Sequence, residues 1–330
     1  MRKYNVAVVG ATGLVGQTFL KVLAEYNFPI KNLRLLASSK SAGKEIVFEG
    51  KTYQVEELTK DSFKDIEICL FSAGSSVSKE FGPIAKEAGA VVIDNSSCFR
   101  EDPDKGLVVP EVNFDDVKIN RLIANPNCST IQSILPLKAL DDKYGLTRVL
   151  YSTYQACSGA GMKGKLDLEN TIKGEKPSHF PHNIAKTCVP EIDVFFDSGY
   201  SKEEIKMVNE TRKILHKPDL AVSATCVRVP VANSHGVMIM CELKKEFELD
   251  DVRKTLAEFQ GIKVLDDPKN HIYPVSTIAN DTDFVYVGRI RRDLSSKNGL
   301  LMWVVADNIR KGAAANAVQI ALKMVQEDLI

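Results

Sequence analysis

The sequence predicts an α/β protein with a Rossmann-type first half and a second half built on a mainly antiparallel sheet. In the first half, short apolar runs alternate with helical stretches, and a glycine turn follows the first run. In the second half, long apolar runs are separated by few helical stretches. These patterns indicate a dinucleotide-binding domain over residues 1–127, joined by about 308–330, and a second domain over 128–307.

Composition and charge exclude several classes of protein. The 330 residues include 43 basic and 43 acidic side chains, so the formal net charge is zero, which argues against nucleic acid or a membrane surface as a partner. The seven cysteines are scattered and odd in number, with no zinc-like Cys/His spacing, so we expect reduced thiols and no metal. The chain begins without a signal peptide or a long apolar run, and we expect a cytoplasmic location.

A glycine turn follows the first expected strand, Tyr4–Val9, and precedes an expected helix, Leu14–Tyr26. This order of strand, glycine turn and helix is typical of a site where backbone N–H groups approach a pyrophosphate. The spacing G-x-x-G-x-x-G alone is a weak signal, and its alternative is a turn without a ligand. The residues expected to contact a dinucleotide are Gly10, Ala11, Thr12, Gly13, Leu14 and Val15.

The turn after the second expected strand, Asn32–Ala37, indicates which dinucleotide binds. NAD enzymes usually place a carboxylate there, for the ribose hydroxyls. This chain has hydroxyls and a cation instead, at Ser38, Ser39, Lys40 and Ser41. This set suits a 2′-phosphate and favours NADP over NAD, although a solvated Ser- and Gly-rich turn is the alternative.

Further strands are expected at Glu67–Phe71 and Ala90–Ile93, with a helix at Val77–Ala88 between them. Ligands bind beyond the carboxyl ends of parallel strands. Arg100 follows such an end, where its planar fork would suit a phosphate, but an ordinary surface arginine is equally compatible with the sequence.

Cys128 lies where the apolar run Leu122–Ala124 ends and a helix over Ser129–Lys143 begins. Unpaired N–H groups at a helix start favour the thiolate, which is the nucleophilic form, and they can also hold an oxyanion. The alternative is a buried, inert thiol.

The second half contains expected strands at Thr147–Gln155, Leu220–Val231, Gly236–Leu243, Phe284–Arg292 and Leu300–Ala306. Expected helices are Met162–Ile172, Ser201–Leu215, Leu249–Phe259 and Lys311–Asp328, of which the last is expected to return to the first domain. Arg228 and His235 flank a turn between two of these strands. Glu210 and Lys213 share a helix face, as a surface ion pair also would.

Taken together, these motifs resemble the bacterial type of aspartate-semialdehyde dehydrogenase. The resemblance runs from residue 4 to the C-terminus, and it rests on the glycine turn and on seven further segments. These segments are Asp94–Arg100, Val109–Asn113, Asn125–Thr130, Tyr154–Gly161, Arg228–Val231, His235–Gly236 and Asp307–Ala314.

The resemblance implies a role for each candidate residue. Cys128 would form a thioester, His235 would act as acid and base, and Gln155 would orient the substrate. Arg228 would bind the substrate carboxylate and Glu210 its ammonium group. Phosphate would bind Arg100, Asn127 and Lys213, and the cofactor would also contact Ser158, Gly159 and Asn308. The family often has Arg where this chain has Lys40, which loosens the expected preference for NADP.

The implied reaction is reductive dephosphorylation of 4-phospho-L-aspartate to L-aspartate 4-semialdehyde and phosphate, with NADPH as reductant. It would serve lysine (diaminopimelate), threonine, methionine and isoleucine biosynthesis, in a homodimer or a tetramer. One alternative is N-acetyl-γ-glutamyl-phosphate reductase, which usually has Asn-Pro-Gly-Cys where this chain has Asn127 before Cys128. Another is a non-catalytic NADPH-binding thiol redox sensor, which would leave Gln155, Arg228 and His235 without a role.

Overall fold

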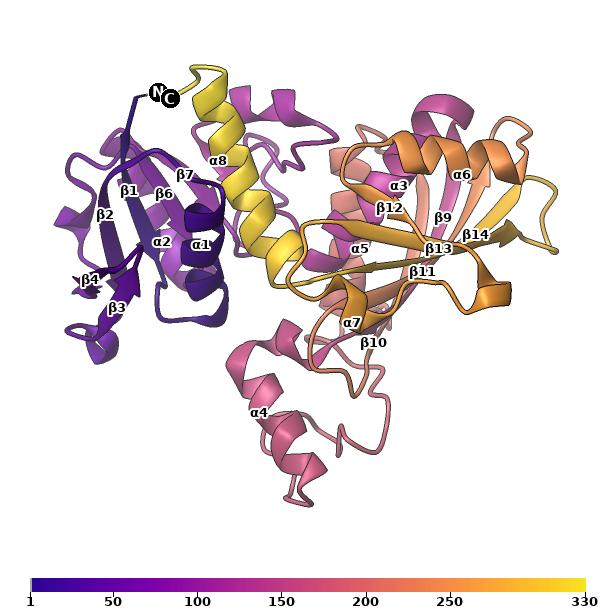
Figure 1. Cartoon of the computed structure of the whole chain (residues 1–330), viewed down its shortest axis with the longest axis horizontal. Coiled ribbons are helices and arrows are strands. Elements are labelled where there is room, and N and C mark those ends of the chain that lie inside the picture. The colour runs from indigo at the N-terminus through magenta and orange to yellow at the C-terminus, as the bar shows by residue number, and fades with distance from the viewer. Residues whose placement is uncertain (1) are drawn as a thin grey trace. The chain divides into compact units, whose positions relative to one another are not determined.

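The computed structural model describes residues 2–330 and divides into two compact units (Figure 1). Unit 1 comprises residues 1–126 and 313–330, and unit 2 comprises residues 127–312. The expected boundaries at 127/128 and 307/308 differ from this division by one residue and by five, since residue 127 and residues 308–312 belong to unit 2. Within residues 2–330, no helix has the length and apolarity that crossing a membrane requires.

Unit 1 is built on a six-stranded parallel sheet in the order β5-β2-β1-β6-β7-β8. Its strands are β1 (Tyr4–Val9), β2 (Ile30–Ala37), β5 (Glu56–Glu57), β6 (Ile68–Phe71), β7 (Val91–Asp94) and β8 (Leu122–Ala124). Strands β3 (Glu45–Phe48) and β4 (Lys51–Gln54) form a separate hairpin. The helices are α1 (Leu14–Glu25), α2 (Ser75–Glu87) and α8 (Asn316–Gln326).

The expected return of the C-terminal helix is confirmed. Buried side chains of α8, including Val318 and Ile320, share one core cluster with Val6 and Val8 of β1 and Phe19 of α1. Figure 1 shows α8 in yellow beside α1. The last helix was expected to run from Lys311 to Asp328, whereas the α-helix α8 runs from Asn316 to Gln326. A π-helix over Arg310–Ala315 precedes α8.

Unit 2 is built on a six-stranded sheet in the order β10-β9-β11-β14-β13-β12. Its strands are β9 (Leu146–Gln155), β10 (Ala221–Arg228), β11 (His235–Leu243), β12 (Ile262–Val264), β13 (Val285–Arg292) and β14 (Gly299–Ala306). The three inner pairings are antiparallel, as expected, whereas the outer pairs β9/β10 and β12/β13 are parallel. The helices are α3 (Cys128–Tyr144), α4 (Gly161–Ile172), α5 (Lys202–Ile214), α6 (Leu249–Glu258) and α7 (Ser276–Ala279).

Helix α3 forms the centre of unit 2. It contacts β9, β11 and β14 on one side and lies against both α5 and α6. Its apolar residues, among them Ile131, Ile134 and Leu137, are fully buried. Because neighbours surround α3, its first residue, Cys128, is held on a rigid element.

Strand β10 ends earlier than expected. We expected it to continue to Val231, but it ends at Arg228, because Pro230 has no N–H to continue a ladder. Strand β11 then begins at His235 itself. Arg228 and His235 are therefore the last and first residues of their strands, and both lie at the same end of the sheet, where Gln155 ends β9.

The glycine turn of unit 1 depends on close backbone packing. A Cβ atom at Gly16 would lie 2.1 Å from the Gly10 carbonyl oxygen, and one at Gly10 would lie 2.4 Å from the Ser72 oxygen. Real Cβ atoms do not approach backbone this closely, so a larger residue must displace the turn.

We predict that Gly16→Ala lowers the free energy of unfolding by at least about 2 kcal/mol, measured by urea denaturation followed by circular dichroism. The control is Gly50→Ala in the β3–β4 hairpin. Gly50 has a positive φ of 75° but nothing within 4 Å of an added Cβ, so only about 1 kcal/mol of backbone strain is expected. Equal losses in the two variants would contradict the role given to the contact of Gly16.

Candidate functional site

The turn between β1 and α1 has the features of a phosphate cradle. Gly10 has a φ of +84°, and the Gly13 N–H donates to the Gly10 carbonyl at 3.0 Å, which closes the turn. Gly13 is the N-cap of α1, no side chain caps it, and the first turn has no acidic residue. The partial positive charge of the helix start therefore meets no built-in anion, as a pyrophosphate site requires.

The turn after β2 lies beside the glycine turn. The Thr12 hydroxyl is 3.5 Å from the Ser41 hydroxyl, which brings the two segments together. Ser38, Ser39 and Lys40 are all exposed at the end of β2. Exposed hydroxyls and a cation next to a helix start suit a dinucleotide with a phosphorylated ribose. These side chains and the glycine turn thus fit the cofactor.

Arg100 belongs to unit 1, in the segment after β7. It is 7% exposed, and its Nη2 donates to the Asn95 carbonyl at 3.0 Å. A buried guanidinium held by a loop carbonyl is better placed for anion binding than a surface arginine. Its expected grouping with Asn127 and Lys213 joins residues of two units and stays a prediction.

In unit 2, Cys128 is the first residue of α3 and is half-buried. Asn127 caps this helix, because its side-chain oxygen accepts hydrogen bonds from the N–H groups of Ser129 at 2.9 Å and Thr130 at 3.3 Å. The thiol therefore lies at the positive end of a 17-residue buried helix.

Glu203 connects the start of α3 to the end of β9. Its Oε1 accepts hydrogen bonds from the side-chain amides of Asn127 at 2.8 Å and Gln155 at 3.1 Å. Its Oε2 pairs with Lys206 at 3.1 Å, and Lys206 also pairs with Asp193 at 2.9 Å. Burial raises the pKa of Glu203, but the charge of Lys206 and the two amide donors outweigh burial and lower this pKa to about 2. Glu203 is therefore a buried, fully charged carboxylate.

Glu210 and Lys213, the pair chosen from the sequence, lie two helical turns further along α5. Glu210 is 1% exposed and accepts the backbone N–H of Asn127 at 2.6 Å. It thus holds the main chain just before α3, while Glu203 contacts the side chains of the site. Both pairs have the spacing Glu-x-x-Lys, and the sequence pattern alone does not distinguish them.

Arg228 and His235 converge on the residue after Gln155. The Nη1 of Arg228 donates to the Ala156 carbonyl at 2.6 Å, and the Ala156 N–H donates to Nδ1 of His235 at 2.9 Å. Arg228 is 5% exposed, and its Nε has no hydrogen-bond partner among residues 2–330. Burial lowers the pKa of Arg228. Guanidinium groups with unused donors are typical sites for carboxylates.

His235 is neutral and has a defined tautomer. Burial, and then the positive charge of Arg228, lower its pKa to about 3. Since Nδ1 accepts a hydrogen bond, the ring hydrogen of the neutral imidazole is on Nε2. Nε2 is buried and has no partner within residues 2–330. The ring therefore presents a spare N–H donor, whereas action as a base at Nε2 would require the other tautomer.

The three residues expected at the cofactor lie close to this pair. A Cβ at Gly159 would be 2.7 Å from Nη1 of Arg228 and 3.2 Å from Nε2 of His235, so a larger residue there would displace the guanidinium. Asn308 donates to the Ser158 hydroxyl at 3.0 Å and accepts the N–H of Ser234 at 2.9 Å. Ser158, Gly159 and Asn308 therefore lie in the same region of unit 2 as Arg228 and His235.

Two further residues, to which the sequence analysis gave no role in the site, support it. Gln132, one turn after Cys128 on α3, donates to the carbonyls of His235 at 3.1 Å and Val304 at 3.2 Å. Gly312 lies against the nucleophile, since a Cβ there would be 2.9 Å from the Cβ of Cys128. The i, i+4 spacing of Cys128 and Gln132 was a usable signal, because it places them on one helix face. Gly312 gave none.

Comparisons with known proteins agree over the whole chain. The family described as "Semialdehyde dehydrogenase, NAD binding domain" matches residues 5–119, and "Semialdehyde dehydrogenase, dimerisation domain" matches residues 137–311. The aspartate-semialdehyde dehydrogenase of Aquifex aeolicus is 54% identical over 99% of both chains, and that of Bacillus subtilis is 45% identical over 100% of this chain and 99% of its own.

Solved structures show the same likeness. Aspartate semialdehyde dehydrogenase II of Vibrio cholerae, complexed with ASA, has a TM-score of 0.94 at 44% identity over 99% of both chains. The enzyme of Candida albicans with NADP has a TM-score of 0.81 at 27% identity, and the match covers 99% of this chain and 100% of that one.

We predict that Glu203→Gln lowers the free energy of unfolding at pH 7 by about 3 kcal/mol, which is the value of a pKa lowered from 4.5 to about 2. The folded-state pKa is depressed, so this contribution is present above pH 4.5 and is lost as the pH falls towards 2. Urea denaturation from pH 7 to pH 3 measures the gap between the wild type and the variant, which should narrow below pH 4.5.

The matched control is Glu258→Gln, which removes an exposed carboxylate and should leave stability nearly unchanged at every pH. A gap for Glu203→Gln that stays constant down to pH 3 would contradict a charged, stabilising Glu203.

Proposed function

This chain belongs to the aspartate-semialdehyde dehydrogenase family, and on that premise we propose that it interconverts 4-phospho-L-aspartate and L-aspartate 4-semialdehyde through a thioester on Cys128. The observation that carries the proposal is the single oxygen of Glu203 that holds both Asn127, next to Cys128, and Gln155. These two hydrogen bonds place the Gln155 amide, which is suited to orienting a carbonyl, near the helix start that carries the nucleophile.

In the reductive direction, the Cys128 thiolate attacks the acyl carbon, a C–S bond forms, and phosphate leaves with the electrons of the C–O bond. When bound, the nicotinamide cofactor supplies hydride to the acyl carbon, or removes it in reverse. The tetrahedral species on Cys128 then collapses to aldehyde and thiolate. The one proton that the reaction consumes is taken up from solvent by the released phosphate.

His235 contributes as a hydrogen-bond donor. Its Nε2–H stabilises the oxyanion that forms when the thioester carbon becomes tetrahedral. The sequence-based role of acid and base is thereby narrowed, because the bond from Ala156 to Nδ1 leaves no lone pair on Nε2 of the neutral ring. A base at this position needs the opposite tautomer.

The two charged ends of the amino-acid substrate have separate partners. Arg228, buried and with unused donors, takes the carboxylate. For the ammonium group we propose Glu203 in place of Glu210, because Glu203 contacts the side chains of Asn127 and Gln155 whereas Glu210 holds backbone. By the same reasoning, Lys206 replaces Lys213 as the phosphate ligand that accompanies Arg100 and Asn127.

For the cofactor we propose NADP, held by the glycine turn and by Ser38, Ser39 and Lys40, with contacts from Ser158, Gly159 and Asn308. The family description supports a nicotinamide cofactor. The cation at Lys40 and the absence of a carboxylate among residues 38–41 favour the phosphorylated form. The proposed role is biosynthesis of lysine (diaminopimelate), threonine, methionine and isoleucine, and the cytoplasmic location stays a prediction.

We predict that the purified protein reduces 4-phospho-L-aspartate with NADPH faster than with NADH, and that Cys128→Ser abolishes this turnover because a serine hydroxyl supplies almost no anion. Stopped assays with each acyl phosphate and each cofactor measure this. The control is Cys188→Ser, which changes an exposed thiol. Turnover of N-acetyl-γ-glutamyl phosphate instead, or residual activity in Cys128→Ser, would reject the proposal. No turnover of either compound would favour the redox sensor.

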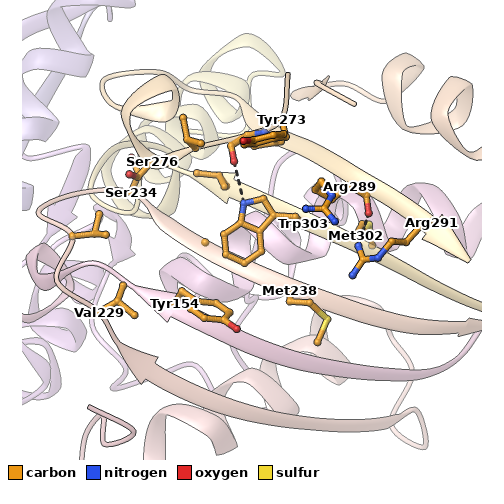
Figure 2. Close-up of a pocket in the computed structure, with 15 residues that line it drawn as sticks. Tyr154, Val229, Ser234, Met238, Tyr273, Ser276, Arg289, Arg291, Met302 and Trp303 are labelled. Atoms are coloured by element: carbon orange, nitrogen blue, oxygen red, sulfur yellow. Dashed lines mark hydrogen bonds between the residues drawn. The ribbon is translucent and has the colours of Figure 1, made fainter. Parts of the chain in front are cut away.

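We also propose that the open face of the unit 2 sheet pairs with a second copy of the chain. This face holds a cavity of about 440 Å³ lined by Tyr154, Met238, Pro274 and Trp303, with Arg289 and Arg291 at its edge (Figure 2). A Cβ at Gly236 would be 2.3 Å from the Trp303 ring, so the indole lies flat across that strand and meets Tyr154 edge-on, with ring centroids 5.3 Å apart.

Support for a second copy as the occupant comes from the family description of residues 137–311 as a dimerisation domain. The Tyr154 side chain is exposed although it is aromatic, and the Trp303 indole N–H is already satisfied by the Pro274 carbonyl at 3.1 Å (Figure 2). Burial of these two rings would remove apolar surface from water while the indole N–H stays paired.

We predict that Met238→Arg shifts the protein from dimer towards monomer in sedimentation equilibrium, because it places an uncompensated charge in the buried face. The control is Leu294→Arg, which changes an exposed apolar residue in the turn between β13 and β14. An unaltered mass for Met238→Arg would place the interface elsewhere.

A further inference from the structure

The segment that follows α4 is fastened by a buried carboxylate that the proposed chemistry does not use. Asp167 of α4 is fully buried, and it accepts hydrogen bonds from the N–H of Ser178 at 2.6 Å, the Ser178 hydroxyl at 2.9 Å and the N–H of Phe180 at 2.9 Å. Burial raises the pKa of Asp167, but these donors outweigh it and lower the pKa below its ordinary value. A charged Asp167 therefore fixes the backbone at Phe180.

The far end of this segment is fastened to Arg228 itself. Val189 and Arg228 exchange both backbone hydrogen bonds, at 2.9 and 2.8 Å. Phe180 packs in a small cluster with Cys157, Leu168 and Ile184, to which Val189 also belongs. Segment 178–189 is thus held at both ends, by Asp167 and by the main chain of Arg228.

The ring of Phe180 faces the guanidinium of Arg228. Cζ of Arg228 lies 5.8 Å from the Phe180 ring centroid, within the range of a cation–π contact. A Cβ at Gly164 would lie 3.2 Å from Cζ of this ring, so the ring has little room to move towards α4. The guanidinium has one further polar contact within residues 2–330, from Nη1 to the Ala156 carbonyl.

We propose that Asp167 and Phe180 are positioning residues for Arg228. Asp167 holds Phe180 so that its ring shields the guanidinium from water and, with the Ala156 carbonyl, sets the direction of the remaining N–H donors. A guanidinium oriented in advance binds a carboxylate with less loss of rotamer freedom. This inference rests on the proposed role of Arg228 at the substrate carboxylate.

The test is steady-state kinetics in which semialdehyde and phosphate are varied independently. We expect Phe180→Leu to raise the KM for semialdehyde about ten-fold, as loss of a desolvated cation–π contact of this kind implies, with kcat and the KM for phosphate changed less than two-fold. Asp167→Asn should also raise the KM for semialdehyde. Phe180→Tyr keeps the ring face and should restore a value near that of the wild type.

Ile184→Ala is the matched control, because it weakens the same cluster without removing the ring. It should lower the melting temperature but leave the KM for semialdehyde unchanged. An equal rise of that KM in Ile184→Ala and Phe180→Leu would overturn the positioning role, as would an unchanged KM in Phe180→Leu beside a raised one in Arg228→Leu. An unchanged KM in Arg228→Leu would overturn the proposed function itself.

Discussion

The arrangement of unit 2 depends on one buried negative charge, the carboxylate of Glu203. It joins three elements that are distant in the sequence: Asn127 at the start of α3, Gln155 at the end of β9, and Lys206 on its own helix. Removing one partner of such a group leaves buried donors unsatisfied, which costs more than the net value of the bonds. The position of Cys128 therefore depends on the carboxylate that holds Asn127, the residue before it.

The positive charge of Arg228, at the ends of the neighbouring strands, complements the negative charge of Glu203. Arg228 and His235 share Ala156, which accepts from the first and donates to the second. Burial, and then the charge of the guanidinium, keep the imidazole neutral, and the main chain selects its tautomer. The carboxylate and the guanidinium thus create, within one unit, places of opposite potential that match the two ends of an amino acid.

The sequence was sufficient where a pattern is local. The fold class, the glycine turn and the strand-to-helix position of Cys128 follow from periodicity and from turn residues, and the structure agrees with each. The sequence did not predict which residues of α5 contact the site in three dimensions. Glu203–Lys206 and Glu210–Lys213 are the same motif on the same helix. Only the structure shows that Glu203 accepts from the side chains of Asn127 and Gln155, whereas Glu210 accepts from the backbone of Asn127.

Two kinds of contact could not be predicted from the sequence: close approach at a glycine, and contact between a loop and a residue distant in the sequence. Gly312 matters because a Cβ there would lie 2.9 Å from the Cβ of Cys128. The π-helix that contains Gly312 also breaks the helical period used to interpret the sequence. Phe180 lies in a stretch without periodicity, and its contact with Arg228 depends on Asp167 more than ten residues earlier. Neither relation leaves a mark in residue spacing.

Strand β9 sets a limit on how the gene can change in length. Tyr154 faces the open side and is 44% exposed, whereas the next residue, Gln155, points to the opposite side and is 1% exposed. The strand is paired along its length with both β10 and β11, so inserting or deleting one codon within it would exchange the two faces. Lineages descended from this gene can therefore gain or lose residues in turns such as 293–298, but not in β9.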